Sequence, residues 1–268
     1  MTSQRLGRGL CFACLGGLLL VAVCGVLFGV GASAAILQES LPSSGLRAVS
    51  VWWMVATRNV VGLVSATTLV ATALGVTFGA VSVYGGAGAA GLLSRLVEFS
   101  GAVPGLLLVG VLRFGDPSGG TLALFGTLAL LRTLEVAQLV RAQVLTTLPN
   151  DFVEASRALG ASRRWQLRVH VLPRVARPLV VNLLVGAASV VGLEAALSFV
   201  GLGLPAATPS WGGGLASLAH GGSAVAWAFT ASSIGLTSAA LYGLGVSLAR
   251  GVQSRTPRAL AGERAGVK

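Results

Sequence analysis

The stretch VVGLVSATTLVATALGVTFGAVSVY, residues 60–84, contains no charged side chain and lies in a longer charge-free run bounded by Arg58 and Arg95. A helix that crosses the hydrocarbon core of a membrane needs about 20 mostly apolar residues. Over the whole chain of 268 residues, 54% are hydrophobic and only 10% are charged, whereas a soluble domain has about a quarter charged residues. We therefore predict an all-α, polytopic membrane protein whose surface is largely covered by lipid.

Six runs are long and apolar enough to be expected as membrane spans. They are Leu10–Val30, Val60–Tyr84, Leu96–Leu112, Thr121–Leu139, Leu179–Val200 and Ser223–Leu248. Ionisable residues interrupt the third run (Glu98) and the fourth (Arg132 and Glu135), so a re-entrant hairpin is the alternative there. Arg132 and Glu135 stand three apart on one helix face. We expect them to form a structural pair, with a contact to substrate as the alternative.

The N-terminal apolar run extends from Gly9 to Gln38 and follows two arginines, a pattern shared with signal peptides. Because its length exceeds the roughly 7–15 residues of a signal-peptide core, we expect an uncleaved first span. All three cysteines, Cys11, Cys14 and Cys24, lie in this run. We interpret them as small apolar helix residues rather than as disulfide or metal ligands.

Basic residues are distributed unequally between the two sides of this six-span topology. Of the 19 arginines and lysines, 15 fall on the side of the N-terminus, three (Arg47, Arg58 and Arg113) fall on the other, and Arg132 lies within a span. Basic loops mark the cytoplasmic side. We therefore expect both termini in the cytoplasm, and we attribute the net charge of +11 to membrane orientation rather than to nucleic-acid binding.

The long inner loop, residues 140–178, is predicted to contain two short helices. Asp151 followed by Glu154 resembles a capping box at a helix start, and apolar residues then recur with helical spacing. Gly160 is a natural helix stop.

The second loop helix is expected over Arg163–Val171, with Ser162 as its N-cap and Pro173 at its end. The arginines of this region suit lipid headgroups or an acidic partner. An amphipathic segment on the membrane surface and a docking surface for another protein therefore both fit the residues.

The same loop also carries a spaced motif. Its elements are Glu154, Ala155 and Ser156, then Gly160, then Leu172 and Pro173. This arrangement resembles the EAA loop of ATP-binding-cassette (ABC) importer permeases: Glu-Ala-Ala, three residues, Gly, nine residues, Ile-x-Leu-Pro. Ser156 stands where that motif has Ala, and His170 where it has Ile.

Further runs resemble the dipeptide/oligopeptide/nickel branch of that family, and within it the second, C-type subunit. They are LVRAQVL (139–145), RALGAS (157–162), LEAALSFVGLG (193–203) and TPSWG (208–212). The similarity covers roughly residues 56–250. We accordingly divide the chain into an N-terminal span with its outer loop (1–55), a permease domain (56–250) and a basic cytoplasmic tail (251–268).

The resemblance implies a type I importer permease fold with cytoplasmic coupling helices, in a bacterial inner membrane. It implies that Glu154 faces an ATPase subunit, that Gly160 permits the bend, and that Leu172 and Pro173 set the return to the fifth span. The residues assigned to ATPase coupling are Glu154, Ala155, Ser156, Arg157, Gly160, Ala161, Leu172 and Pro173. The implied partners are a homologous second permease, two ATPase subunits or domains, an extracytoplasmic substrate-binding protein and membrane lipid.

No enzymatic constellation is evident in the sequence. A phosphate loop requires a lysine after its glycines, and the only lysine is Lys268. We therefore expect no cofactor on this chain and ATP hydrolysis, with Mg²⁺, in partner chains. The resemblance favours di- or oligopeptides as substrate, with nickel or another small solute as the alternative. A proton-coupled transporter with Glu194 as carrier and a non-transporting membrane scaffold are the rival classes.

Glu194 is the only ionisable residue between Arg177 and His220, and it lies in the fifth expected span. Such groups usually face a cavity or a partner. We predict Glu194, Ser198 and Trp211 as pathway or gate residues; the alternative is a structural carboxyl group capped by Ser198. Residues 201–222, rich in Gly and Pro, predict a bent, re-entrant outer element that meets the substrate-binding protein or the outer gate.

Overall fold

The computed structural model describes residues 46–84, 87–102, 105–115, 120–205, 207–219 and 224–253. Its elements are α3 (Leu46–Tyr84), α4 (Ala87–Ala102), α5 (Gly105–Gly115), α6 (Gly120–Thr147), α7 (Asp151–Ala158), α8 (Arg163–Gln166), the π-helix η1 (Leu167–Val171), α9 (Leu172–Phe199), α10 (Trp211–Ala219) and α11 (Ala224–Gln253). These ranges contain no β-strand, and the all-α prediction is confirmed.

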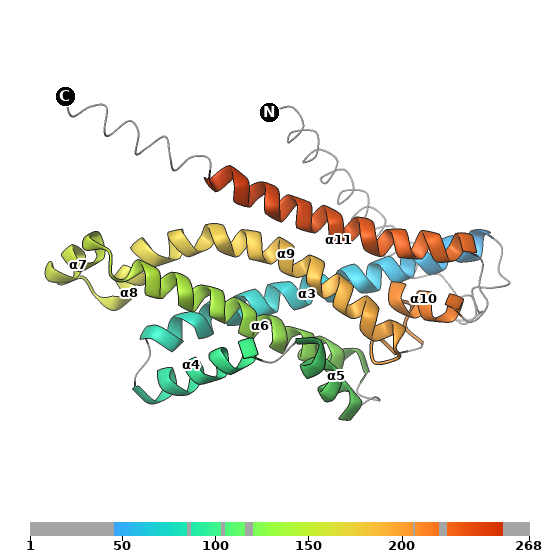
Figure 1. Ribbon diagram of the computed structural model, residues 1–268, viewed down its shortest axis with the longest axis horizontal. Coiled ribbons are helices and arrows are strands. Elements are labelled where there is room, and N and C mark those ends of the chain that lie inside the picture. The colour runs from blue at the N-terminus through green and yellow to red at the C-terminus, as the bar shows by residue number, and fades with distance from the viewer. Residues whose placement is uncertain are drawn as a thin grey trace.

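The four long helices of the described ranges, α3, α6, α9 and α11, run side by side along the long axis of the molecule (Figure 1). In the described ranges, four segments have the length and composition of membrane spans: Trp52–Tyr84, Gly120–Thr147, Leu167–Phe199 and Trp227–Arg250. They correspond to the second, fourth, fifth and sixth predicted spans. The first, Leu10–Val30, and its three cysteines lie outside the described residues, as does most of the basic tail.

The third predicted span, Leu96–Leu112, is wrong as a single helix. Two shorter helices, α4 and α5, take its place, and Pro104 falls in the sequence between them. Proline lacks a backbone N–H and disfavours helical geometry in the residue before it, so an apolar run that contains proline is not necessarily one helix. Glu98 does not interrupt α4 but lies within it. Its carboxylate pairs with the Arg141 guanidinium of α6 at 3.1 Å.

Helix α3 begins at Leu46, 14 residues before the predicted start of the second span, and runs through the predicted domain boundary after residue 55. Arg58 does not interrupt it. Arginine is a good helix former, and its guanidinium donates hydrogen bonds to the side-chain oxygen of the neighbouring Asn59.

The predicted helix stop at Pro173 is also wrong. The helix continues from α8 through η1 into α9, with Pro173 in the first turn of α9 and Pro178 inside it. A proline removes one donor and crowds the preceding turn. A π-helical segment, η1, lies immediately before Pro173, which stands in the first turn of α9, where a missing backbone N–H is tolerated.

The closest packing among the long helices joins α3 to α6. A methyl group added to Gly75 would lie 2.9 Å from the carbonyl oxygen of Thr133, and one on Gly79 would lie 2.8 Å from that of Ala137. Small residues four apart let two membrane helices approach at backbone distance. This contact holds the α6 end, and with it the inner loop, against α3.

Candidate functional site

The inner loop lies at one end of the bundle, where α7 and α8 extend beyond the long helices (Figure 1). α7 is present as predicted, but the capping box is not. Asn150 is the N-cap and makes no side-chain cap bond, while its amide group donates backward to the carbonyl oxygens of Thr146 and Thr147. The amide of Asn150 thus fixes the α6–α7 corner, and Asp151 and Glu154 are left with their carboxylates near the positive end of α7.

The bend predicted at Gly160 is present. Gly160 has φ of 85°, in the left-handed region that favours glycine. Its N–H donates to the carbonyl oxygen of Arg157, and that of Ala161 donates to Ser156 O, which closes the end of α7. Ser162 caps the next helix as predicted, because its Oγ accepts the Trp165 N–H at 3.3 Å.

The two faces of α7 differ sharply. Val153 and Ser156 are buried, and the Ser156 hydroxyl donates to Val153 O at 2.7 Å. Ser156 therefore fits the buried position as a small residue with its polar group satisfied inside the helix. Glu154, Ala155 and Arg157 are exposed, so the residues expected to meet an ATPase form a free surface in the described chain.

A ring cluster that the sequence prediction missed ties α7 to the second half of the loop. The His170 ring contacts Phe152 of α7 (centroids 5.2 Å apart) and Trp165 of α8 (5.1 Å). The Arg174 guanidinium carbon lies 4.2 Å from the Phe152 ring centre. His170 thus supplies a flat ring between two others at the position where the motif has Ile. The aromatic residues of this loop are the sequence signal from which the ring cluster could have been predicted.

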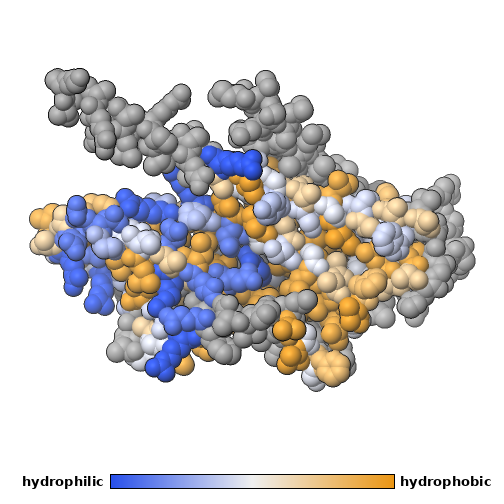
Figure 2. All heavy atoms as spheres, in the orientation of Figure 1, coloured by the Kyte–Doolittle hydropathy of each residue, from blue (hydrophilic) through white to orange (hydrophobic). Residues whose placement is uncertain are grey.

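Leu172 and Pro173 are also exposed, at the start of α9 on the same end of the molecule. Hydrophilic side chains gather over the half that contains α7 and α8, and apolar ones cover most of the rest (Figure 2). The loop therefore presents a charged end surface. Six of the eight predicted coupling residues are exposed there, Ala161 is half-buried, and Ser156 is buried beneath them.

At the opposite end, the structure brings two of the predicted gate residues into direct contact. Glu194 is fully buried, and its Oε1 accepts the Ser198 hydroxyl at 2.7 Å. The Ser198 Oγ in turn accepts the Leu204 N–H at 3.1 Å, and the Ser210 hydroxyl also interacts with the carboxyl group. No well-formed hydrogen bond reaches the second oxygen, Oε2, from the described part of the chain.

The chain between α9 and α10 folds back as predicted for a bent outer element. Gly201, with φ of 85°, ends α9, and the Leu202 N–H donates to Leu197 O. Ser210 starts α10 by accepting the Gly213 N–H at 3.1 Å. A Cβ on Gly212 would collide with the backbone of Ala195, so α10 rests directly on α9.

Trp211, the third predicted gate residue, is fully buried and anchors α10 to α3. Its Nε1 donates to Thr57 Oγ1 at 3.3 Å, and Thr57 donates to Trp53 O at 2.8 Å. Trp53 donates to Ser233 of α11 at 3.0 Å. Trp211 therefore belongs to a buried network across three helices rather than to an open surface.

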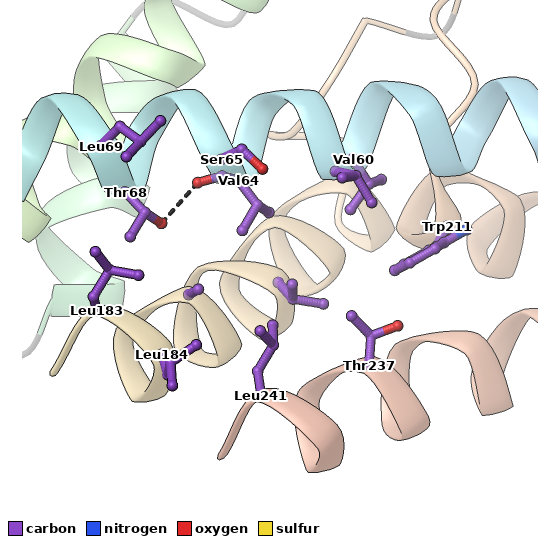
Figure 3. A pocket seen from close by; sticks show the side chains of 13 residues that line it. Val60, Val64, Ser65, Thr68, Leu69, Leu183, Leu184, Trp211, Thr237 and Leu241 are labelled. Atoms are coloured by element: carbon purple, nitrogen blue, oxygen red, sulfur yellow. Dashed lines mark hydrogen bonds between the residues drawn. The ribbon is translucent and has the colours of Figure 1, made fainter. Parts of the chain in front are cut away.

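A cavity of about 360 Å³ lies beside Trp211, between α3, α9 and α11. Figure 3 shows Val60 and Thr68 of α3 facing Leu184 of α9 and Leu241 of α11 across it. Its lining is apolar except for Ser65, Thr68 and Thr237.

Arg132 and Glu135 form the predicted pair in α6. Arg132 is 5% exposed, and its Nη2 also donates to Asn182 Oδ1 of α9 at 3.0 Å. The Glu135 side chain is 46% exposed. The third partner, Asn182, could not be found from the sequence, because it lies 50 residues away.

Within the described ranges, no three His, Cys, Asp or Glu side chains stand close enough together to hold a metal ion.

Comparison with known families gives one match over most of the chain. The family described as "Binding-protein-dependent transport system inner membrane component" matches residues 71–252. This range contains the inner loop, Glu194 and α10.

Individual relatives agree with this family. The chain is 27% identical over 169 residues to the oligopeptide transport system permease protein OppC of Lactococcus lactis subsp. cremoris (63% of this chain, 58% of the relative). It is 31% identical over 139 residues to OppC of Bacillus subtilis (52% and 45%). It is 35% identical over 141 residues to the dipeptide transport system permease protein DppC of Escherichia coli K12 (52% and 46%). The chain spans about half the length of these curated relatives.

Among solved structures, the fold is similar to a chain of the MetNI methionine ABC transporter in inward-facing conformations. The TM-score is 0.57 at 20% identity, over 75% of this chain and 97% of that chain. At this identity the likeness establishes the fold alone.

Proposed function

The chain belongs to the family of binding-protein-dependent transport system inner membrane components, and from this we propose that it is the permease subunit of an ABC importer. The family is one of transport permeases rather than catalytic enzymes. In this proposal the chain forms part of the translocation pathway, and separate ATPase subunits hydrolyse the ATP, with its Mg²⁺.

The observation that carries the proposal is the exposed face of α7. Glu154, Ala155 and Arg157 are exposed, while Val153 and Ser156 on the other face are buried against the rest of the molecule. The Gly160 turn and the ring cluster fix its angle to α8. Because these contacts fix α7 to the rest of the permease, α7 moves together with the membrane spans. When a bound ATPase dimer closes, it therefore displaces α7 and, through it, α9.

The mechanism follows from this connection. From α8 through η1 to α9 the helix is continuous, and α9 carries Glu194 at its far end. A displacement of the loop therefore reaches the outer element through one helix. ATP binding drives the change only if the ATPase binds the two states of the permease with different affinity, and rigid-body rocking of the spans is the expected response.

We further propose the arrangement of the assembly. A homologous second permease completes the pathway, two ATPase subunits or domains bind the inner loops, and an extracytoplasmic binding protein delivers substrate at the α10 end. The excess of basic residues at the α7–α8 end favours a cytoplasmic position for the loop and both termini, in a bacterial inner membrane.

Di- or oligopeptides are the proposed substrate, since the relatives named above are permease proteins of oligopeptide or dipeptide transport systems. Uptake of a labelled panel of di- and oligopeptides, with nickel as the alternative, in a strain that lacks the gene tests this assignment. Uptake of nickel alone would contradict it.

The docking role is tested with Glu154→Ala and Gly160→Pro in the assembled complex. Proline cannot adopt φ of 85° and removes the N–H bonded to Arg157 O. We expect both variants to reach the membrane but to lose uptake, while ATP hydrolysis no longer responds to substrate. Glu98→Ala, which removes an exposed carboxylate from α4, is the control and should retain coupling. Normal coupling in Gly160→Pro would overturn the docking assignment.

A further inference from the structure

A second cavity, of about 220 Å³, lies where the inner loop meets the long helices. Its lining includes Tyr84 at the end of α3, Leu148 just after α6, Arg157 of α7, and Arg163 and Gln166 of α8. The volume is several times the roughly 30 Å³ that one water molecule occupies in the liquid. The cavity therefore has room for a polar group larger than water.

The polar groups around this cavity are mainly donors. Among the described residues, neither Arg157 nor Arg163 is part of an ion pair, and no acidic residue lines the cavity. The Tyr84 hydroxyl is buried and has no hydrogen-bond partner in the described chain. The positive charge of Arg163 is near enough to interact electrostatically with it. Buried polar groups normally have a partner, but the Tyr84 hydroxyl lacks one, and the two exposed arginines beside it have no acidic side chain in the cavity to pair with.

The position of the cavity indicates where the anion comes from. Tyr84 and Thr147 are the last residues of two spans, so the cavity lies at the level where lipid headgroups begin. Val83 and Leu148 give it an apolar wall toward the spans, while the two arginines stand on the loop side. A phosphate with an acyl chain attached fits this polarity better than a free anion does.

We propose that this cavity binds the phosphate group of an anionic phospholipid, with Arg157, Arg163 and the Tyr84 hydroxyl as its donors. A phosphate bound there would bridge α3 to both helices of the loop, because its ligands come from α3, α7 and α8. Arginine suits such a site, since its planar guanidinium donates two parallel hydrogen bonds to phosphate oxygens. Lipid binding at this site requires a membrane but no ATPase, so the lipid-binding proposal and the transport proposal can be tested independently.

The test measures lipid retention by the purified full chain in detergent. Native mass spectrometry compares bound phosphatidylglycerol with bound phosphatidylcholine for the wild type, Arg163→Gln, Tyr84→Phe and Arg168→Gln. Arg168→Gln is the matched control, because this exposed arginine lies on the same loop but outside the cavity. Arg157 is left unchanged, since α7 belongs to the proposed docking face.

We expect the wild type and Arg168→Gln to retain phosphatidylglycerol in preference to phosphatidylcholine. Arg163→Gln should weaken that binding about fivefold, which corresponds to the loss of one basic residue at an anionic surface, and Tyr84→Phe should weaken it less. Thermal unfolding of each variant confirms that it is folded, and Arg163→Lys, which keeps the charge, should restore part of the affinity.

Three results would overturn the proposal. Equal losses in Arg168→Gln and Arg163→Gln would show only a general basic surface. Inorganic phosphate that binds as tightly as the lipid and displaces it would assign the site to a free anion. No preference for phosphatidylglycerol, together with weaker ATPase association in Arg163→Gln, would assign it to an acidic side chain of the partner.

Discussion

At the scale of single residues, Glu194 shows how an ionisable group is placed inside a membrane helix. An isolated charge there is unfavourable by several kcal/mol, and its carboxyl group instead accepts the Ser198 hydroxyl, which is itself held by the Leu204 N–H. These contacts join the end of α9 to the chain that leads into α10. They favour a positioning role for Glu194, and a role in the gate stays a prediction.

Glu194→Gln and Glu194→Ala separate these roles. Glutamine keeps the oxygen that accepts from Ser198, so we expect thermal stability and uptake close to wild type. Alanine leaves Ser198 without its acceptor and should lower stability by about 1–3 kcal/mol, as measured by thermal unfolding in detergent. If folded Glu194→Gln has no uptake, the ionisable proton itself is required, and a proton-coupled mechanism gains support.

The ring cluster at the inner loop also permits a residue-scale test. Phe152→Ala removes one ring contact and the Arg174 interaction, worth about 0.5–1.5 and 0.5–1 kcal/mol respectively in comparable sites. We expect faster hydrogen exchange across α7 and weaker coupling of ATP hydrolysis to uptake. Leu159→Ala is the control, because Leu159 is 89% exposed and should change neither quantity. Unchanged exchange in Phe152→Ala would show that the cluster does not hold α7.

At the scale of elements, the pairing of α3 with α6 depends on two glycines spaced one helical turn apart. Gly75 and Gly79 both touch the backbone of α6, whereas a Cβ on Gly62 of the same helix would meet nothing within 4 Å. The same substitution therefore has opposite expected effects at different positions along α3.

Gly75→Ala should lower the free energy of unfolding by about 1–3 kcal/mol, as for other overpacked contacts. Gly62→Ala should be neutral or stabilising by up to about 1 kcal/mol, since alanine is the better helix former. Thermal unfolding of both variants in the same detergent makes the comparison. Equal stability of the two would mean that α3 and α6 do not pack at backbone distance.

At the scale of the whole molecule, the bundle has two distinct ends. The α7–α8 end is basic and carries the exposed coupling residues. The α10 end is tied to α3 and α11 through Trp211, Thr57 and Trp53, and it rests on α9 at Gly212. The continuous helix from α8 to α9 joins the two ends. This layout suits a protein that receives a mechanical signal at one side of a membrane and responds at the other.

The proposed orientation gives a direct test. Trypsin should cut the inner loop, which has exposed arginines at positions 157, 163 and 168, in inverted membrane vesicles but not in right-side-out ones. Fragments detected with antibodies to the two chain ends would locate the cuts. Cleavage in right-side-out vesicles alone would reverse the orientation.

Local sequence is enough to predict the helical membrane class, four of the spans, the turn at Gly160 and the cap at Ser162. These features depend on local properties: the length of an apolar run, the freedom of glycine at positive φ, and a hydroxyl beside free N–H groups. A local window of sequence contains all of that information. The EAA spacing likewise identified the loop, since the motif lies within 20 residues.

Tertiary structure alone decided the continuation past Pro173 and the partners of the buried polar groups. Trp211 and its hydrogen-bond partner Thr57 are 154 residues apart in the sequence, and Arg132 and Asn182 are 50 residues apart. A buried polar side chain must bond to whatever the fold brings beside it, and such neighbours are set by helix packing rather than by sequence spacing.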